Sequence, residues 1–142
     1  MRRDRALALK NYQLNNILPV SGTLASTNES HGDMLVDLAV SERWSGKVIA
    51  TKGQFQFELL PGVIGNVMVR HSSNGIVGVY VDNSLGVRAQ WAGKGLGVAL
   101  ILYGYDHGKT PSADRQFTTA GAATMTKAMS VANGDRTNPF WP

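Results

Sequence analysis

Alternating apolar and polar positions dominate the middle of the chain. The clearest example is the segment 54–59, in which Phe55, Phe57 and Leu59 alternate with two glutamines and a glutamate. Because successive side chains of a β-strand point to opposite faces, this pattern predicts a strand whose phenylalanines face the core and whose polar residues, Glu58 among them, face water. Comparable runs predict further strands over 34–40, 47–51, 63–70, 76–81, 87–91 and 96–103.

Turn signals separate these runs at short intervals. Asn74 and Gly75 both tolerate the positive φ of a two-residue hairpin turn, and they stand between two β-rich runs. Pro61 and Gly62 suit the two central positions of a type II turn. We therefore expect an all-β fold, a single antiparallel β-sandwich or barrel of about seven strands with long N- and C-terminal extensions. The pattern does not distinguish a sandwich from a barrel.

The last of the expected strands, 96–103, is apolar without a polar interruption. It follows Gly93-Lys94-Gly95, which we interpret as a turn between strands. A continuous apolar strand is usually covered on both faces, so we expect this one at the centre of the sheet or against another subunit. The run is far shorter than the roughly 20 residues of a membrane-spanning helix, and we expect no membrane contact.

The segments on either side of 34–104 have a different character. Residues 1–33 are polar and rich in Asn, Ser and Thr, which indicates an extended arm with a basic start. Residues 105–142 read as a C-terminal extension, in which the Ala-, Met- and Thr-rich stretch 118–132 predicts a short helix ended by Gly134. The expected organisation is therefore an arm, a β-domain over 34–104 and an extension.

Positive charge is concentrated at the start of the chain. The 142 residues suit one domain and carry a formal net charge of +4. The first ten residues contain four cations and one acid, so they carry +3 of this charge and the remainder carries +1. The cations are Arg2, Arg3, Arg5 and Lys10. A basic arm on a nearly neutral body is a candidate contact for phosphates or another partner.

Apolar residues also occur near both termini, where a free tail would expose them to water. Ile17 and Leu18 interrupt the polar arm, and Phe140 and Trp141 precede the final residue. Burying a large aromatic side chain contributes about 1.5–3 kcal/mol. We therefore expect these residues to dock, either on the body of the same chain or on a neighbouring subunit or partner.

Motifs of catalysis and of cofactor binding do not stand out. The segment 104–110 holds two glycines before Lys109 and Thr110, but three residues separate the glycines where a phosphate-binding P-loop needs four. The absence of cysteine excludes thiol nucleophiles and cysteine zinc sites, and the histidines lack metal-ligand spacing. A serine-hydrolase elbow and a zinc-protease motif are missing as well. We predict no catalytic residues, no metal and no cofactor, and hence no enzyme.

Three functions fit these features. The leading hypothesis is a non-enzymatic, homo-oligomeric structural protein, such as a bacteriophage coat or decoration protein, within a larger assembly. Low charge, at 17% of residues, suits packing against copies of the same chain. The chain start lacks a secretory pattern, so we expect a location in the virion or the cytoplasm. The partner and the oligomer order leave no local signature in the sequence.

Two alternatives remain open at this point. A cytoplasmic ligand-binding β-barrel would hold an apolar pocket lined by Phe55, Phe57, Trp91 and Tyr103. Nucleic-acid binding through the basic arm would be independent of base sequence and would weaken steeply with salt.

Overall fold

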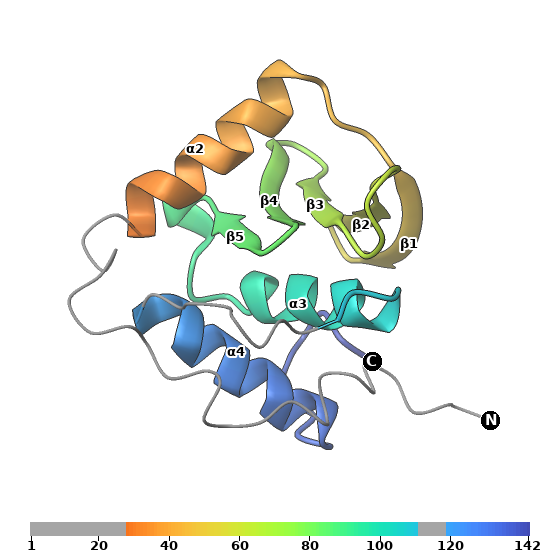
Figure 1. Ribbon diagram of the computed structural model, residues 1–142, viewed down its shortest axis with the longest axis vertical. Coiled ribbons are helices and arrows are strands. Elements are labelled where there is room, and N and C mark those ends of the chain that lie inside the picture. The colour runs from red at the N-terminus through yellow and green to blue at the C-terminus, as the bar shows by residue number, and fades with distance from the viewer. Residues whose placement is uncertain (1–27, 111–118) are drawn as a thin grey trace.

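A five-stranded antiparallel sheet with helices on both of its faces forms the centre of the molecule (Figure 1). The computed structural model describes residues 28–110 and 119–142. Neighbouring strands follow the chain in the order β1-β2-β3-β4-β5. The strands are β1 (Lys47–Lys52), β2 (Phe55–Leu59), β3 (Val67–His71), β4 (Gly75–Val81) and β5 (Ser84–Val87).

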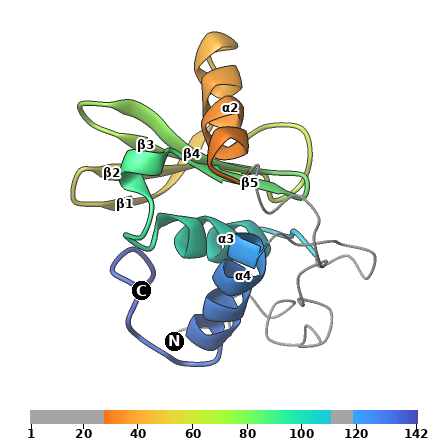
Figure 2. The same ribbon diagram turned by 90° about the vertical axis from the view of Figure 1, so that its left-hand side faces the viewer.

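The helices form separate layers above and below the sheet (Figure 2). Helix α2 (Asn28–Ser41) covers β4 and β5 on one face, and α3 (Leu96–Asp106) covers β3, β4 and β5 on the other. Helix α4 (Thr119–Ala132) packs on the far side of α3, in the range where a short helix is expected. None of the described helices is long and apolar enough to cross a membrane. The antiparallel sheet is confirmed, but the fold is a mixture of sheet and helix, and the sheet does not close into a barrel.

The expected strand over 34–40 is wrong, because these residues belong to α2. Apolar residues lie on several sides of this helix and therefore imitate the alternation of a strand. Val36 and Ala39, three residues apart, are fully buried against the sheet, whereas Met34 is 65% exposed and Val40 48% exposed. The buried stripe has helical spacing, and the exposed apolar residues concealed it.

The expected strand over 96–103 is also wrong, since this run forms most of α3. A short continuous apolar run fits a buried strand or a buried helix equally well. Most of α3 is buried because the sheet covers one side of the helix and α4 covers the other. Coverage on both sides was anticipated, but the element itself is a helix.

Smaller differences concern turns and strand ends. His71 and Gly75 are register partners, so the hairpin loop is 72–74 and the expected two-residue turn at 74–75 is wrong. The His71 Nδ1 atom accepts hydrogen bonds from the backbone N–H groups of Ser73 and Asn74, at 3.1 and 3.3 Å, and so stabilises the longer loop. The expected strand over 87–91 is wrong, because β5 covers Ser84–Val87 and the following residues form the 3-10 helix η3 (Ala89–Trp91).

Two hydrophobic cores lie on opposite faces of the sheet. Phe57 and Val69 belong to the larger core, together with α3, α4 and the C-terminal aromatics. Met68, one position from Val69, belongs to the smaller core under α2. This switch reflects the two-residue period of a strand. The C-terminal residues are thus part of the main core.

The expectation that Glu58 faces water is wrong, because this residue is buried, with 2% of its surface exposed. Its register partner is Met68, so it lies on the face that carries the smaller core. The Arg70 Nε atom donates a hydrogen bond to Glu58 Oε2 at 2.8 Å, and the backbone N–H of Gly46 donates one to Oε1 at 3.0 Å. These donors compensate the burial of the carboxylate.

Two glycines allow α2 to lie directly against β5. A Cβ atom at Gly86 would stand 2.8 Å from the Gly32 carbonyl oxygen. Real Cβ atoms do not approach oxygen so closely, and a side chain at this position would push the helix away. The start of α2 therefore lies against the edge of β5, next to the cavity described below.

Candidate functional site

A cavity of about 340 Å³ opens where the chain passes from β5 into α3. Its volume lies within the range of about 300–1,000 Å³ typical of small-molecule sites. The walls come from the edge of β5, the loop before α3, the first turn of α3 and one side of α4. They include Gly32, Leu85, Val87, Ala89, Trp91, Ala92, Gly93, Gly95, Leu96, Gly97, Val98, Gly121 and Thr124.

Glycine shapes the loop that enters α3. Gly93 and Gly95 have φ values of 76° and 95°, in the left-handed region that side chains disfavour. The third glycine, Gly97, lies in the first turn of the helix and lines the cavity. A Cβ atom at Gly93 would meet nothing within 4 Å, so the backbone is open to a ligand there, whereas one at Gly95 would stand 3.0 Å from the Asn138 side-chain nitrogen.

The first turn of α3 lines the cavity, and its backbone N–H groups are candidates for polar contacts with a ligand. The first intrahelical bond runs from the Ala99 N–H to the Gly95 carbonyl at 3.0 Å, so the N–H groups of residues 96–98 precede the helical hydrogen-bond ladder. Gly95 is the N-cap residue and offers no side-chain cap, and the first turn contains no acidic residue. Such a terminus carries a partial positive charge and favours an anion.

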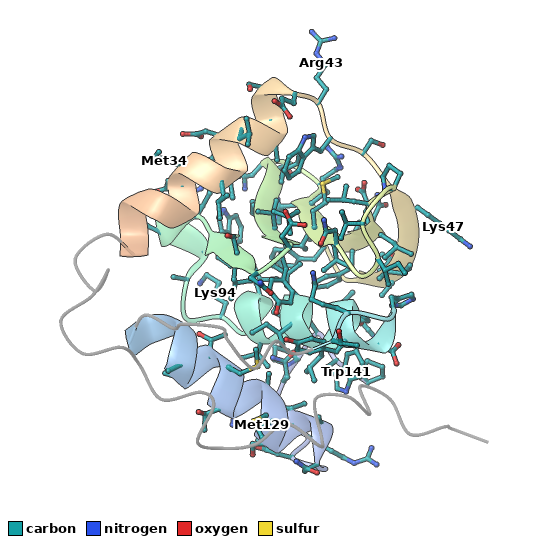
Figure 3. The ribbon with its side chains drawn as sticks, in the orientation of Figure 1. Met34, Arg43, Lys47, Lys94, Met129 and Trp141 are labelled. Atoms are coloured by element: carbon teal, nitrogen blue, oxygen red, sulfur yellow. The ribbon has the colours of Figure 1, made fainter. Side chains whose placement is uncertain are left out.

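Lys94 adds a full positive charge next to this terminus. It stands between two glycines that line the cavity, and its side chain is exposed. Figure 3 shows Lys94 at the start of α3. Lys94 does not itself line the cavity, but its charge adds to the positive potential around the start of α3.

Trp91 forms an aromatic wall of the cavity. Its indole lies against the His71 ring at a tilt of 37°, with centroids 4.7 Å apart, and meets Phe55 edge-on at 5.5 Å. The Nε1 atom of Trp91 is buried and has no hydrogen-bond partner in the described part of the chain. A wall of this kind suits an apolar or planar part of a ligand.

The outer edge of β5 forms another wall. The Arg88 N–H donates to the Val77 carbonyl at 2.9 Å, and Gly86 pairs with Val79. Since hydrogen-bonding direction alternates along an antiparallel strand, the backbone groups of Leu85 and Val87 point to the outer edge. Leu85 and Val87 both line the cavity, so the edge presents apolar side chains and peptide groups together.

The C-terminal aromatics dock on the chain's own core. The Phe140 ring lies 5.1 Å from that of Phe55, and the Trp141 ring lies 4.9 Å from that of Tyr103. Figure 3 shows Trp141 beside α3. The Tyr103 hydroxyl donates a hydrogen bond to the Phe140 carbonyl at 2.7 Å. The other candidate residues, Ile17, Leu18, Arg2, Arg3, Arg5 and Lys10, lie outside the residues that the structure describes.

The four aromatics of the expected barrel pocket have different roles. Phe57 and Tyr103 are buried core residues whose rings lie 4.7 Å apart, and Phe55 packs against Phe140. Trp91 is the member of this set that lines the cavity at the start of α3. The proposed interior of a barrel is thus filled by packed side chains.

The segment resembling a P-loop has a structural role. Lys109 is buried, and its Nζ donates to the Asn66 Oδ1 atom and to the Asp82 carbonyl, each at 2.9 Å. The ammonium group also lies 4.6 Å from the centre of the Tyr80 ring. Lys109 therefore ties the end of α3 to two loops. No cluster of three potential metal ligands occurs within 28–110 and 119–142.

The sequence pattern did not reveal that residues 93–97 lead into a helix. Its signal is visible, since three glycines at alternate positions follow a strand and precede an apolar run. A glycine-rich loop between a strand and a helix is a common anion-binding arrangement. The misassignment of 96–103 as a strand made the glycines look like an ordinary turn.

The chain was also compared with known proteins. No family model, curated protein or solved structure matches it.

Proposed function

We propose that this chain binds a phosphate-bearing small molecule in the cavity between β5, α3 and α4. The single observation that carries the proposal is the uncapped N-terminus of α3, whose first residues line the cavity together with Gly93 and Gly95. The phosphate would accept hydrogen bonds from the first N–H groups of the helix, with Lys94 nearby. The proposal is one of binding and includes no catalytic step.

The other walls indicate that the ligand also has an organic part. Leu85, Val87 and Trp91 present apolar and aromatic surface beside the anion-binding groups. A free inorganic anion would leave this surface unused. A nucleotide or a nucleotide-bearing carrier combines a phosphate with a planar or extended group, so we propose this class of ligand.

Calorimetric titration of the full chain tests the proposal. The ligands to titrate are inorganic pyrophosphate, ADP, NAD and coenzyme A, each at two salt concentrations. We expect saturable binding of at least one nucleotide-bearing compound, tighter than that of pyrophosphate and weakened by salt. Absence of binding by all four compounds would count against the proposal.

The variant Gly97→Ala tests whether the ligand binds in this cavity. A Cβ atom at Gly97 would meet its nearest neighbours at 3.4 Å, an ordinary contact, so the variant should fold normally. The added methyl group narrows the cavity beside the helix N-terminus. We expect the affinity to fall about tenfold, which corresponds to roughly 1.4 kcal/mol. Unchanged affinity would mean that the ligand binds elsewhere.

A second candidate function is homo-oligomeric assembly, including a role as a virion coat or decoration protein. The exposed apolar residues of α2 favour it, since Met34 is 65% and Leu38 44% exposed. The packing of Phe140 and Trp141 on their own core removes one of the original reasons for this hypothesis. Light scattering tests this function. A mass of two or more chains would support assembly if the double variant Met34→Gln, Leu38→Gln had the mass of a single chain.

A further inference from the structure

Another cavity lies on the α2 side of the sheet, away from the proposed ligand site. Its volume is about 560 Å³, and it is bounded by the second half of α2, the segment 60–66 and the turn between β4 and β5. We call it the α2 groove. Its lining is mostly apolar and consists of Leu35, Leu38, Trp44, Leu60, Pro61, Val63, Asn66, Val81, Asp82 and Ser84.

The α2 groove continues the smaller hydrophobic core toward the surface. Leu35, Leu60 and Val81 pack against that core. Further out, Leu38 is 44% exposed and Val63 is 56% exposed. Apolar surface that is contiguous with a core and open to water is typical of an interaction site. The groove therefore offers a surface that a further apolar segment would cover.

The chain itself contains a segment of matching character. Residues 17–20 are Ile, Leu, Pro and Val, an apolar run within the polar arm, and they lie outside the residues that the structure describes. Seven residues separate this run from Asn28, where α2 begins. One of the seven is Gly22, which permits a reverse turn.

The length of this connection suffices for the run to reach the groove within one chain. The eight residue steps from Val20 to Asn28 span up to about 26 Å when extended. With a rise of 1.5 Å per residue, Leu35 lies about 10 Å along α2 from Asn28, and Leu38 lies about 15 Å along it. The extended connection is thus longer than the stretch of helix that it has to pass.

Charge favours the same occupant. Among the residues that line the groove, Asp82 alone is charged. The arm that contains residues 17–20 carries four cations and one acid in its first ten residues, so its net charge is opposite to that of the groove. Attraction between them adds to the match in apolar character.

We propose that residues 17–20 bind in the α2 groove of their own chain. The run then covers the exposed side chains of Leu38 and Val63. Because it occupies the α2 face, it opposes the pairing of two chains through that face. The inference is independent of the phosphate-binding proposal, which concerns the opposite end of β5 and the start of α3.

Disulfide cross-linking of the full chain tests the proposal, since the chain has no cysteine of its own. The test pair is Ser21→Cys with Ser84→Cys, which places one thiol beside the run and one in the groove. The control pair is Ser21→Cys with Thr51→Cys. Thr51 is exposed and lies in β1, at the edge of the sheet opposite β5.

We expect the test pair to form a disulfide within one chain at least tenfold faster than the control pair. Adding Ile17→Asn and Leu18→Asn should reduce the rate of the test pair to that of the control. Equal rates for the two pairs would overturn the proposal. A disulfide-linked dimer formed by the test pair in dilute solution would overturn it too, because the occupant would then be the arm of a second copy.

Nuclear magnetic resonance supplies a readout without cysteines. Ile17→Asn with Leu18→Asn in the natural chain should shift the amide signals of Leu38 and Val63 and leave that of Thr51 unchanged. Unchanged signals for Leu38 and Val63 would contradict the proposal. Binding of pyrophosphate and ADP should be the same in this variant as in the natural chain, so failure of either proposal is distinguishable from failure of the other.

Discussion

The side-chain amide of Asn138 donates a hydrogen bond to the backbone carbonyl of Gly95, with the two atoms 3.0 Å apart. The same side chain accepts the Phe140 N–H through Oδ1 at 2.9 Å. The C-terminal segment, anchored by its aromatics in the main core, therefore fixes the residue that begins α3. A segment far along the chain thus supports the geometry of the cavity.

Asn138→Ala should weaken both the fold and the site. The change removes two hydrogen bonds at a residue that is 9% exposed. We expect the free energy of unfolding to fall by about 1–3 kcal/mol and ligand affinity to fall as well. Chemical denaturation and calorimetry measure the two effects. Asn133→Ala, at an exposed site beyond α4, is the control and should leave the affinity unchanged.

Lys94→Ala should weaken ligand binding without affecting stability. The side chain is exposed, so its contribution is electrostatic and screened by salt. We expect affinity to fall about two- to fivefold at low salt and the difference to shrink at high salt. Lys47→Ala removes an equally exposed lysine from β1, away from α3 (Figure 3). If both variants lost the same affinity, the effect would reflect net charge rather than the site.

Glu58 should make the fold sensitive to acid. Burial alone would raise its pKa, but hydrogen bonds from Arg70, Gln56 and the Gly46 N–H outweigh burial and hold the pKa below its ordinary value of 4.5. A carboxyl group with a lowered pKa stabilises the fold above its unfolded pKa, and this stabilisation is lost as the pH falls through the folded pKa. We therefore expect the free energy of unfolding to decline as the pH drops below about 5.

Glu58→Gln isolates this contribution. At neutral pH the variant should be less stable by about 1–3 kcal/mol, because Arg70 and Gly46 lose their charged acceptor. The difference from the natural chain should shrink as the pH falls through the lowered pKa of Glu58, because the natural carboxyl group then becomes protonated too. Urea denaturation across this pH range measures the difference. A constant gap at every pH would show that ionisation of Glu58 does not contribute.

A pair of glycine substitutions tests the close approach of α2 to β5. Gly86→Ala would place a Cβ atom 2.8 Å from the Gly32 carbonyl, whereas Gly97→Ala makes only ordinary contacts at 3.4 Å. We expect the first variant to lose about 1–3 kcal/mol of stability and the second to lose almost none. Thermal unfolding followed by circular dichroism measures both. Equal stabilities would contradict the helix placement.

The sequence predicted the sheet where one face of a strand is clearly apolar. Phe55 and Phe57 face the main core as their alternation requires. The two helices were missed because each lacks a clear helical pattern of apolar and polar residues. Leu96–Asp106 is covered on both sides, so it carries no periodic signal, and α2 exposes Met34, Leu38 and Val40, which blurs its helical stripe. In both cases tertiary packing decided the element.

The cavity was not foreseen from the sequence because of that misassignment. Gly93, Gly95 and Gly97 are visible in the sequence, but they become an anion-binding loop only when the following run is a helix. The bond between Asn138 and Gly95 joins distant segments and leaves no local pattern. The burial of Glu58 likewise depends on Arg70 in the neighbouring strand.

The most direct test of the proposed site is a titration of the isotope-labelled full chain with pyrophosphate and then with ADP, followed by nitrogen–proton correlation spectra. If the N-terminus of α3 binds the phosphate, the largest shifts will occur at the amides of Leu96, Gly97 and Val98, and ADP will add changes at the amides of Leu85 and Val87, which line the apolar wall. Shifts confined to other regions, or none at concentrations that saturate ordinary nucleotide sites, would contradict the account.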